Sequence, residues 1–158
     1  MSDILGAETI SNIQKYRNYK EQFKRLKKAF DYEFYMEAIF IEYAIMEDRT
    51  EAILRYEGNE IKQKNEREHI TITRKLKKIT SIARQNKSLP QRYFSDGIIE
   101  NTLNWVKQRN GLNHALLKKE LTTNDIEAYA LEGKHLARAL CNKANNYKKA
   151  IERREAKK

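Results

Sequence analysis

The chain has 158 residues, a formal net charge of +10, one proline, five glycines and one cysteine, Cys141. This length predicts a single domain, over residues 1–158, that can bury a core of its own. A lone cysteine excludes an intramolecular disulfide, and no Cys/His cluster has zinc spacing, so we expect neither a metal nor a cofactor.

Targeting and membrane signals are not apparent in the sequence. No run approaches the ~18 apolar residues of a membrane span, and the first residues lack the basic and apolar regions of a signal peptide. We therefore expect a cytoplasmic protein that does not enter a membrane.

The charge balance points to a polyanionic partner. The 32 lysine and arginine residues outnumber the 22 aspartate and glutamate residues, and such an excess attracts polyanions over long range. Nucleic acid is the first choice of partner and an anionic membrane surface the second. The alternative is that the cations only keep the protein soluble.

The first two predicted helices form the N-terminal part. The first covers residues 11–30, and its apolar face contains, at helical steps, Tyr19, Phe23, Leu26 and Phe30. The second covers residues 31–56, with Asp31 as a plausible N-cap. Between residues 34 and 46 it is apolar nearly all round, which predicts a buried, central helix.

Two more helices are predicted in the middle of the chain. The third covers residues 65–85 and leads into a loop at 86–90, because proline biases the residue before it away from helix. The fourth begins at Ser95, a good cap, and continues through Trp105 into residues 108–121.

The last predicted helix runs from Asp125 to near the C-terminus, with Asn124 and Glu127 placed to form a capping box. Its apolar stripe alternates steps of four and three: Ile126, Ala130, Gly133, Ala137, Leu140, Ala144, Tyr147 and Ile151. Half of these are Ala or Gly, so a neighbouring helix can approach closely. The charged tail from about residue 152 is expected to fray. The chain as a whole predicts an all-α, up-and-down bundle of about five helices.

His114 is the histidine with the most informative neighbours. Continuing the stripe of Ile99, Leu103 and Val106 by helical steps leads to Asn110 and then His114. Polar side chains on an inward-facing stripe need hydrogen-bond partners. Either they form a functional site, or inside the core Asn110 is hydrogen-bonded to the backbone and His114 to a carboxylate. The other two histidines are expected to be exposed or structural.

Arg109 lies five residues before His114. On an ideal helix this spacing gives an angular offset of about 140° and a rise of about 7.5 Å. The two side chains do not share a face, but both could reach one phosphate at the helix edge or across a dimer seam.

The segment Arg109-Asn110-Gly111-Leu112-Asn113-His114, late in a small all-α chain, resembles the signature of the HEPN superfamily. Members of that superfamily are often ribonucleases or toxins of defence systems and typically act as dimers. The resemblance implies a HEPN-like fold, a homodimer, RNA as substrate, and an antitoxin or defence-complex protein as a further partner. Leu116 stands where HEPN toxins paired with a nucleotidyltransferase antitoxin often carry tyrosine, so regulation by modification of that tyrosine is not implied.

Carried onto this chain, the resemblance assigns roles to three residues. Arg109 would bind and polarise the scissile phosphate, since its guanidinium stays charged and matches phosphate oxygens. His114 would assist proton transfer as the ribose 2′-hydroxyl attacks phosphorus. Asn110 would orient His114 or the phosphate. Such cleavage of single-stranded RNA needs no metal.

Glu42 and Arg49 are a second polar pair, seven residues apart on the predicted central helix. They could form an inner wall of the site, with Glu42 holding the imidazole or Arg109. Alternatively they fall on the one solvated strip of this helix, or pair locally with Asp48 and with neighbouring lysine or arginine residues.

Three functions remain open from the sequence. The first is metal-independent endoribonuclease activity, as in a toxin or an antiviral effector. The second is a basic bundle that binds RNA or a protein without cutting. The third is an assembly module that oligomerises through the stripe at residues 126–151.

Overall fold

The computed structural model describes residues 11–65 and 68–158 of the chain, and in these ranges it contains six α-helices and no β-strand. The helices are α1 (Asn12–Asp31), α2 (Tyr35–Arg55), α3 (Ile72–Ala83), α4 (Leu89–Phe94), α5 (Ile98–Ala115) and α6 (Thr123–Glu155). The all-α prediction is therefore confirmed.

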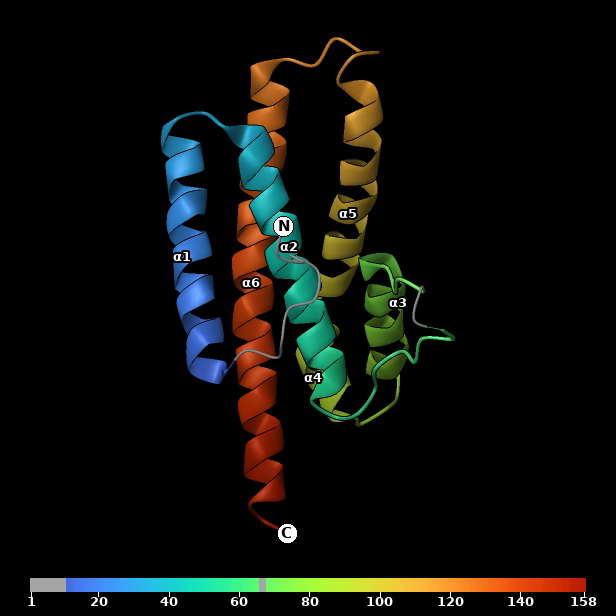
Figure 1. Cartoon of the computed structure of the whole chain (residues 1–158). Coiled ribbons are helices and arrows are strands. Elements are labelled where there is room, and N and C mark those ends of the chain that lie inside the picture. Colours follow the sequence, from blue (N-terminus) through green and yellow to red (C-terminus); the bar gives the residue numbers. More distant parts are fainter. Residues whose placement is uncertain (1–10, 66–67) are drawn as a thin grey trace.

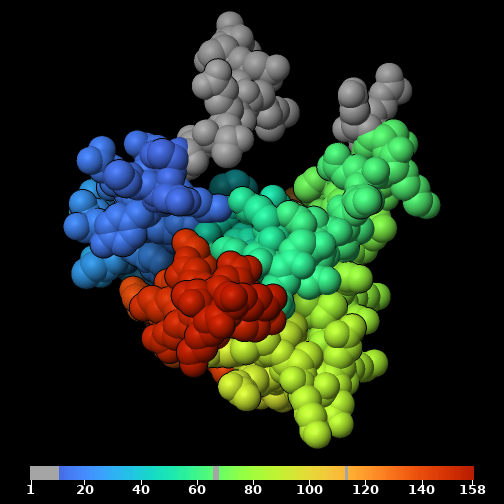
Figure 2. All heavy atoms as spheres, turned by 90° about the horizontal axis from the view of Figure 1, so that it is seen from below, coloured from blue at the N-terminus to red at the C-terminus, as the bar shows by residue number. Residues whose placement is uncertain are grey.

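The four long helices run up and down beside one another (Figure 1). In this group α2 runs opposite to α1, α5 runs opposite to α2, and α6 runs opposite to α5. The short helices α3 and α4 lie at the lower end of α5. Seen end-on, the C-terminal end of α6 lies between α1 on one side and the α3–α4 region on the other (Figure 2). No helix in the described ranges is both long and apolar enough to cross a membrane.

α2 is the central helix, as its sequence predicts. It contacts α1, α3, α5 and α6, and its interface with α6 is the largest in the molecule. Its burial is not complete, however. Phe34 and Phe40 are 59% and 66% exposed, and Met36 and Ala44 are exposed as well. One strip of the N-terminal half of α2 therefore faces solvent, where the sequence predicts burial nearly all round.

The small-residue stripe of α6 packs inside the chain. Seven of its eight positions are buried, and Ile126 is partly buried. Gly133 is the tightest point, because its Cα faces the carboxyl group of Glu42 and the ring of Trp105. The stripe is used within the bundle, so in the folded chain it is not a free face for oligomerisation.

Several helix ends differ from the predicted ones. Asp31 is the last residue of α1 rather than the cap of the next helix, and α2 begins after Phe34, which makes no side-chain cap. A further helix, α4, begins at Leu89, inside the loop expected at residues 86–90, because Ser88 caps it and Pro90 sits in its first turn.

The first residues of α3, α5 and α6 also differ from the predicted ones. Ser95 ends α4, and α5 starts after Gly97, whose φ of 88° suits glycine. The capping box of α6 is made by Thr122 with Asp125, not by Asn124 with Glu127. α3 begins only at Ile72, where Thr71 caps it.

The C-terminal tail is helical for longer than predicted. α6 extends to Glu155, because Ile151 is buried and Arg154 forms an ion pair of 2.6 Å with Glu57. Fraying from about residue 152 is therefore not observed.

Gly133→Ala is expected to lower the free energy of unfolding by about 1–3 kcal/mol, because the added methyl group would overpack the core. It would collide with the Glu42 carboxylate and lie 2.6 Å from Cζ2 of Trp105. Gly111→Ala is the matched control, since nothing lies within 4 Å of its Cβ position; removing this helical glycine should stabilise by roughly 0.5–1 kcal/mol. Urea unfolding of both variants measures the two effects, and equal stability would contradict the close packing at Gly133.

Candidate functional site

The rotation of α5 is set by a reciprocal pair of hydrogen bonds to α6. Nε1 of Trp105 donates to the carbonyl oxygen of Tyr129 at 3.1 Å, and the Tyr129 hydroxyl donates to the carbonyl oxygen of Trp105 at 2.6 Å. The two rings are stacked, with centroids 4.9 Å apart. This contact fixes which way the following turns of α5 point, including the turn that carries Arg109.

Arg109 points toward α2. Its side chain is half-buried, and its Cζ lies 4.4 Å from the centroid of the Tyr43 ring. A guanidinium over a tyrosine face is attracted to the ring and keeps its N–H donors free at the edge of the contact. Arg109 is therefore a positioned cation at the junction between α5 and α2.

Asn110 and His114 lie on the exposed side of α5. The prediction that they continue the buried stripe of Ile99 and Val106 is wrong. Each helical step of four residues turns the side chain by about 40° in the same sense. The stripe leaves the core at the first such step beyond Val106, and Leu117, the position after His114, is 98% exposed.

The site residues predicted on α5 do not converge within one copy of the chain. No hydrogen bond or ion pair joins Arg109, Asn110 and His114 in the described ranges. A groove of about 1590 Å³ is present on the other side of α2, and neither Arg109 nor His114 lines it. What α5 offers is an exposed imidazole and a half-buried guanidinium on adjoining faces.

Glu42 is buried between α2, α5 and α6. Its side chain is 0% exposed, and neither carboxyl oxygen has a hydrogen-bond partner in the described part of the molecule. Burial raises the pKa of Glu42 to about 9, although the charge of Lys134 lowers it. The carboxyl group is therefore neutral at pH 7 and sits against Trp105 and Gly133, not on a solvated strip.

Arg49 lies on the same stripe of α2 as Glu42, two turns further along the helix, but its side chain has different partners. It is 9% exposed, donates from Nη2 to Asp48 at 2.6 Å, and lies 4.4 Å from the centroid of the Tyr19 ring on α1. Glu42 sits against Gly133 of α6 and Trp105 of α5, whereas Arg49 is held by Asp48 and Tyr19 and lines a groove that Arg109 does not line. The idea that these two residues form one inner wall beside Arg109 is therefore wrong.

Sequence reasoning did not single out the partners that hold these groups. Tyr43 and Tyr129 position Arg109 and α5, but in the sequence they read as ordinary core aromatics. Lys134 and Arg138 on α6 carry a signal that was available: two cations four residues apart that flank the small-residue stripe. Their contacts with α1 depend on the tertiary structure.

Comparisons with protein-family models, with curated proteins and with solved structures found no match for this chain. The resemblance to the HEPN superfamily thus depends on the segment from Arg109 to His114 and on the all-α fold.

The neutral state of Glu42 predicts a pH dependence. The folded chain keeps this proton up to about pH 9, whereas the unfolded chain, with an ordinary pKa of 4.5, releases it. Between these values each pH unit therefore lowers the free energy of unfolding by about 1.4 kcal/mol. We expect Glu42→Gln to lack this loss, so that its stability advantage over the wild type grows from pH 5.5 to pH 8.5.

Urea unfolding at several pH values measures this difference. Glu100→Gln, which removes an exposed carboxylate from the first turn of α5, is the control and should parallel the wild type. If Glu42→Gln also parallels the wild type across this range, Glu42 is not held neutral by burial.

Proposed function

We propose that this protein is a cytoplasmic, metal-independent endoribonuclease of HEPN type that cuts single-stranded RNA. The observation that carries the proposal is the exposed imidazole of His114 on the same helix as the positioned guanidinium of Arg109. Imidazole is the side-chain group that most often takes up or releases a proton in catalysis. A guanidinium matches the oxygens of a phosphodiester.

The reaction would proceed by attack of the ribose 2′-hydroxyl on the adjacent phosphorus. The bond from the 2′-oxygen to phosphorus forms and the bond from phosphorus to the 5′-oxygen breaks, which leaves a 2′,3′-cyclic phosphate and a 5′-hydroxyl. His114 would take the proton of the 2′-hydroxyl or give one to the leaving oxygen. Arg109 would stabilise the negative charge that develops on the phosphate oxygens.

Arg109 would lose little free energy on leaving Tyr43 to bind a phosphate. Its contact with Tyr43 is at the protein surface, where a cation–π interaction contributes about 0.5–1 kcal/mol. A phosphate contact with charge-assisted hydrogen bonds offsets that loss. The ring of Tyr43 would thus hold the guanidinium ready without preventing it from binding.

A second copy of the chain would complete the site. Arg109 and His114 on one α5 point about 140° apart, whereas a two-fold axis lets Arg109 of one copy meet His114 of the other. Exposed apolar side chains are present on the same helices or directly after them: Met36 and Phe40 on α2, and Leu116 and Leu117 after the last residue of α5. A second copy, or an antitoxin or defence-complex protein that competes with it, would cover them.

RNA binding without cleavage is the second candidate. It is favoured by the engagement of Arg109 with Tyr43 and by the absence of any bond between Arg109 and His114 in the described ranges. In that case both residues would be surface groups of a basic bundle.

Cleavage of single-stranded RNA in EDTA tests the first candidate. We expect His114→Ala and Arg109→Ala each to slow cleavage by roughly 10²–10³-fold, since positioned proton transfer and charge stabilisation have effects of this size. His135→Ala removes an exposed histidine from α6 and should cut like the wild type. Replacing the 2′-hydroxyls with 2′-O-methyl groups should abolish cutting.

The same variants test whether two copies share a site. A mixture of Arg109→Ala and His114→Ala protein should regain part of the activity, because a mixed dimer holds one site with both groups intact. Cleavage by His114→Ala at the wild-type rate would exclude the nuclease proposal, and salt-sensitive binding without cutting by the wild type would support the second candidate.

A further inference from the structure

A basic groove lies between α1 and α6, on the side of α2 that faces away from α5. Nine lysine and arginine side chains and only two carboxylates line it. The groove thus carries a net charge of seven out of the +10 of the whole chain. We call it the α1–α6 groove.

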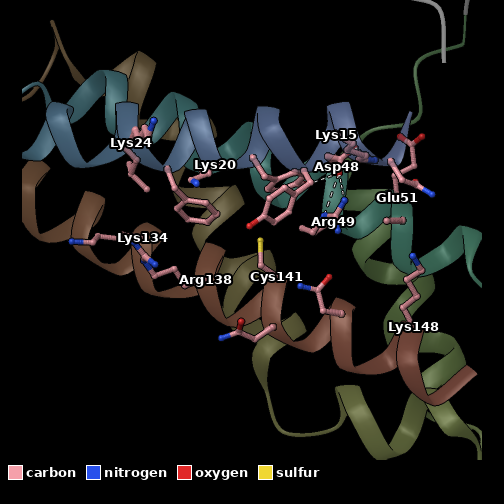
Figure 3. A pocket seen from close by; sticks show the side chains of 18 of the residues that line it. Lys15, Lys20, Lys24, Asp48, Arg49, Glu51, Lys134, Arg138, Cys141 and Lys148 are labelled. Atoms are coloured by element: carbon pink, nitrogen blue, oxygen red, sulfur yellow. Dashed lines mark hydrogen bonds and ion pairs between the residues drawn. The ribbon is translucent and has the colours of Figure 1, made fainter. Parts of the chain in front are cut away.

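The cations form two facing rows (Figure 3). Lys20 and Lys24 lie along α1, and Lys134 and Arg138 lie along α6 on the opposite wall. In the described part of the chain, Lys20, Lys134 and Arg138 form no ion pair. Their charges are therefore not neutralised by the protein itself.

The carboxylates are confined to the other end of the groove. Asp48 is paired with Lys15 at 2.7 Å and with Arg49 at 2.6 Å, and these contacts hold its pKa at about 2 although burial alone would raise it. Glu51 is bonded to Lys75 at 3.0 Å, outside the groove. At the end with Lys20, Lys24, Lys134 and Arg138 no carboxylate lines the groove, and the one carboxylate paired with these cations is that of Glu21, 3.9 Å from Lys24.

Aromatic rings of α1 hold three of the cations in place. Arg49 lies 4.4 Å from the ring centroid of Tyr19, Arg138 lies 4.9 Å from that of Phe23, and the Lys134 Nζ lies 4.8 Å from that of Phe30. Each cation comes from α2 or α6 and each ring from α1. Stacking restricts these long side chains before any ligand binds, which lowers the entropy lost on binding.

Tyr16 adds an exposed ring to the same groove. It lines the groove from α1 and is 70% exposed, so its face is free to stack. Proteins that bind single-stranded nucleic acid combine a positively charged groove for the backbone with aromatic rings on which unpaired bases stack. Duplex bases are already stacked on one another and cannot use such a ring.

We propose that the α1–α6 groove binds a single strand of nucleic acid, with phosphates between Lys20 and Lys24 on one wall and Lys134 and Arg138 on the other, and a base stacked on Tyr16. These contacts involve phosphates and base faces only. The groove therefore accepts single-stranded DNA and RNA alike. This activity is separate from cleavage, which requires the 2′-hydroxyl and residues of α5.

The salt dependence of binding tests the phosphate contacts. The probe is a fluorescent single-stranded DNA or 2′-O-methyl RNA oligonucleotide, neither of which the proposed nuclease can cut. The variant is Lys20→Gln/Arg138→Gln, which removes two exposed cations from the groove. Because each phosphate contact contributes about 0.7 to the slope of log K against log salt for single strands, the slope should flatten by about 1.4.

Lys77→Gln/Lys78→Gln is the matched control. It removes the same charge from exposed positions on α3 that do not line the groove, and the slope should stay close to that of the wild type. Equal slopes for the two double variants would overturn the proposal. A membrane surface is the other possible partner. If the wild type binds no single strands but binds vesicles of anionic phospholipid, and the groove variant loses this vesicle binding, the proposal is overturned in favour of a membrane surface.

Tyr16 and Cys141 provide two independent readouts. Tyr16→Ala should weaken single-strand binding about tenfold without affecting duplex binding, and Tyr16→Phe should restore it, since the ring rather than the hydroxyl stacks. Cys141 lines the groove and is the only cysteine, and burial raises the pKa of its thiol to about 11. Because the thiolate is the reactive form, alkylation is followed at pH 9.5 until the free protein is modified; an oligonucleotide in the groove should slow this reaction, and an unchanged rate would overturn the proposal.

The groove proposal and the nuclease proposal can be tested independently of each other. His114→Ala should bind oligonucleotides in the groove like the wild type even if it cuts no RNA. Retained groove binding with no cleavage by the wild type would leave this inference standing and exclude the nuclease. Loss of binding in His114→Ala at unchanged stability would overturn the assignment to the α1–α6 groove.

Discussion

The close contact between α2 and α6 is the constraint on which the other positions depend. Small residues along α6 let the two helices approach, and at Gly133 the Glu42 carboxyl and the Trp105 ring occupy the space of a missing side chain. Trp105 in turn is bonded to Tyr129 and so connects α5 to α6. One tight packing point thus sets the placement of α2, α5 and α6 together.

This packing divides α2 into faces with different chemistry. The ring of Tyr43 contacts the guanidinium of Arg109 on α5, whereas the guanidinium of Arg49 stacks on the ring of Tyr19 on α1. Glu42 lies between them and is neutral at pH 7, because burial makes its charged form costly. The proposed cleavage site and the α1–α6 groove are therefore on opposite sides of one helix.

The pairing of cations with rings explains how a chain of high net charge keeps a compact core. Lys134 and Arg138 flank the buried stripe of α6 and extend over aromatic rings of α1. Their aliphatic parts cover apolar surface while the charged ends stay in solvent. Like charges are thereby concentrated in one groove, where a polyanion would relieve their mutual repulsion.

Much of the fold follows from local sequence. The all-α class, the central helix and the small-residue stripe of α6 were predictable, because the periodicity of apolar residues belongs to each helix by itself. The exact ends were less predictable: α4 was missed, since a loop signal from Pro90 also fits the first turn of a helix. For the site, the sequence supplied the candidates Arg109 and His114 but not their surroundings.

The tertiary structure alone decided which polar residues are buried. Asn110 and His114 continue an apolar stripe in the sequence but are exposed, because the neighbouring helices no longer cover that side of α5. Glu42 is buried without a partner because α6 approaches it at Gly133. The α1–α6 groove likewise joins residues more than 100 positions apart, such as Phe23 and Arg138. Burial and pairing of this kind depend on where other helices pass, which local periodicity does not specify.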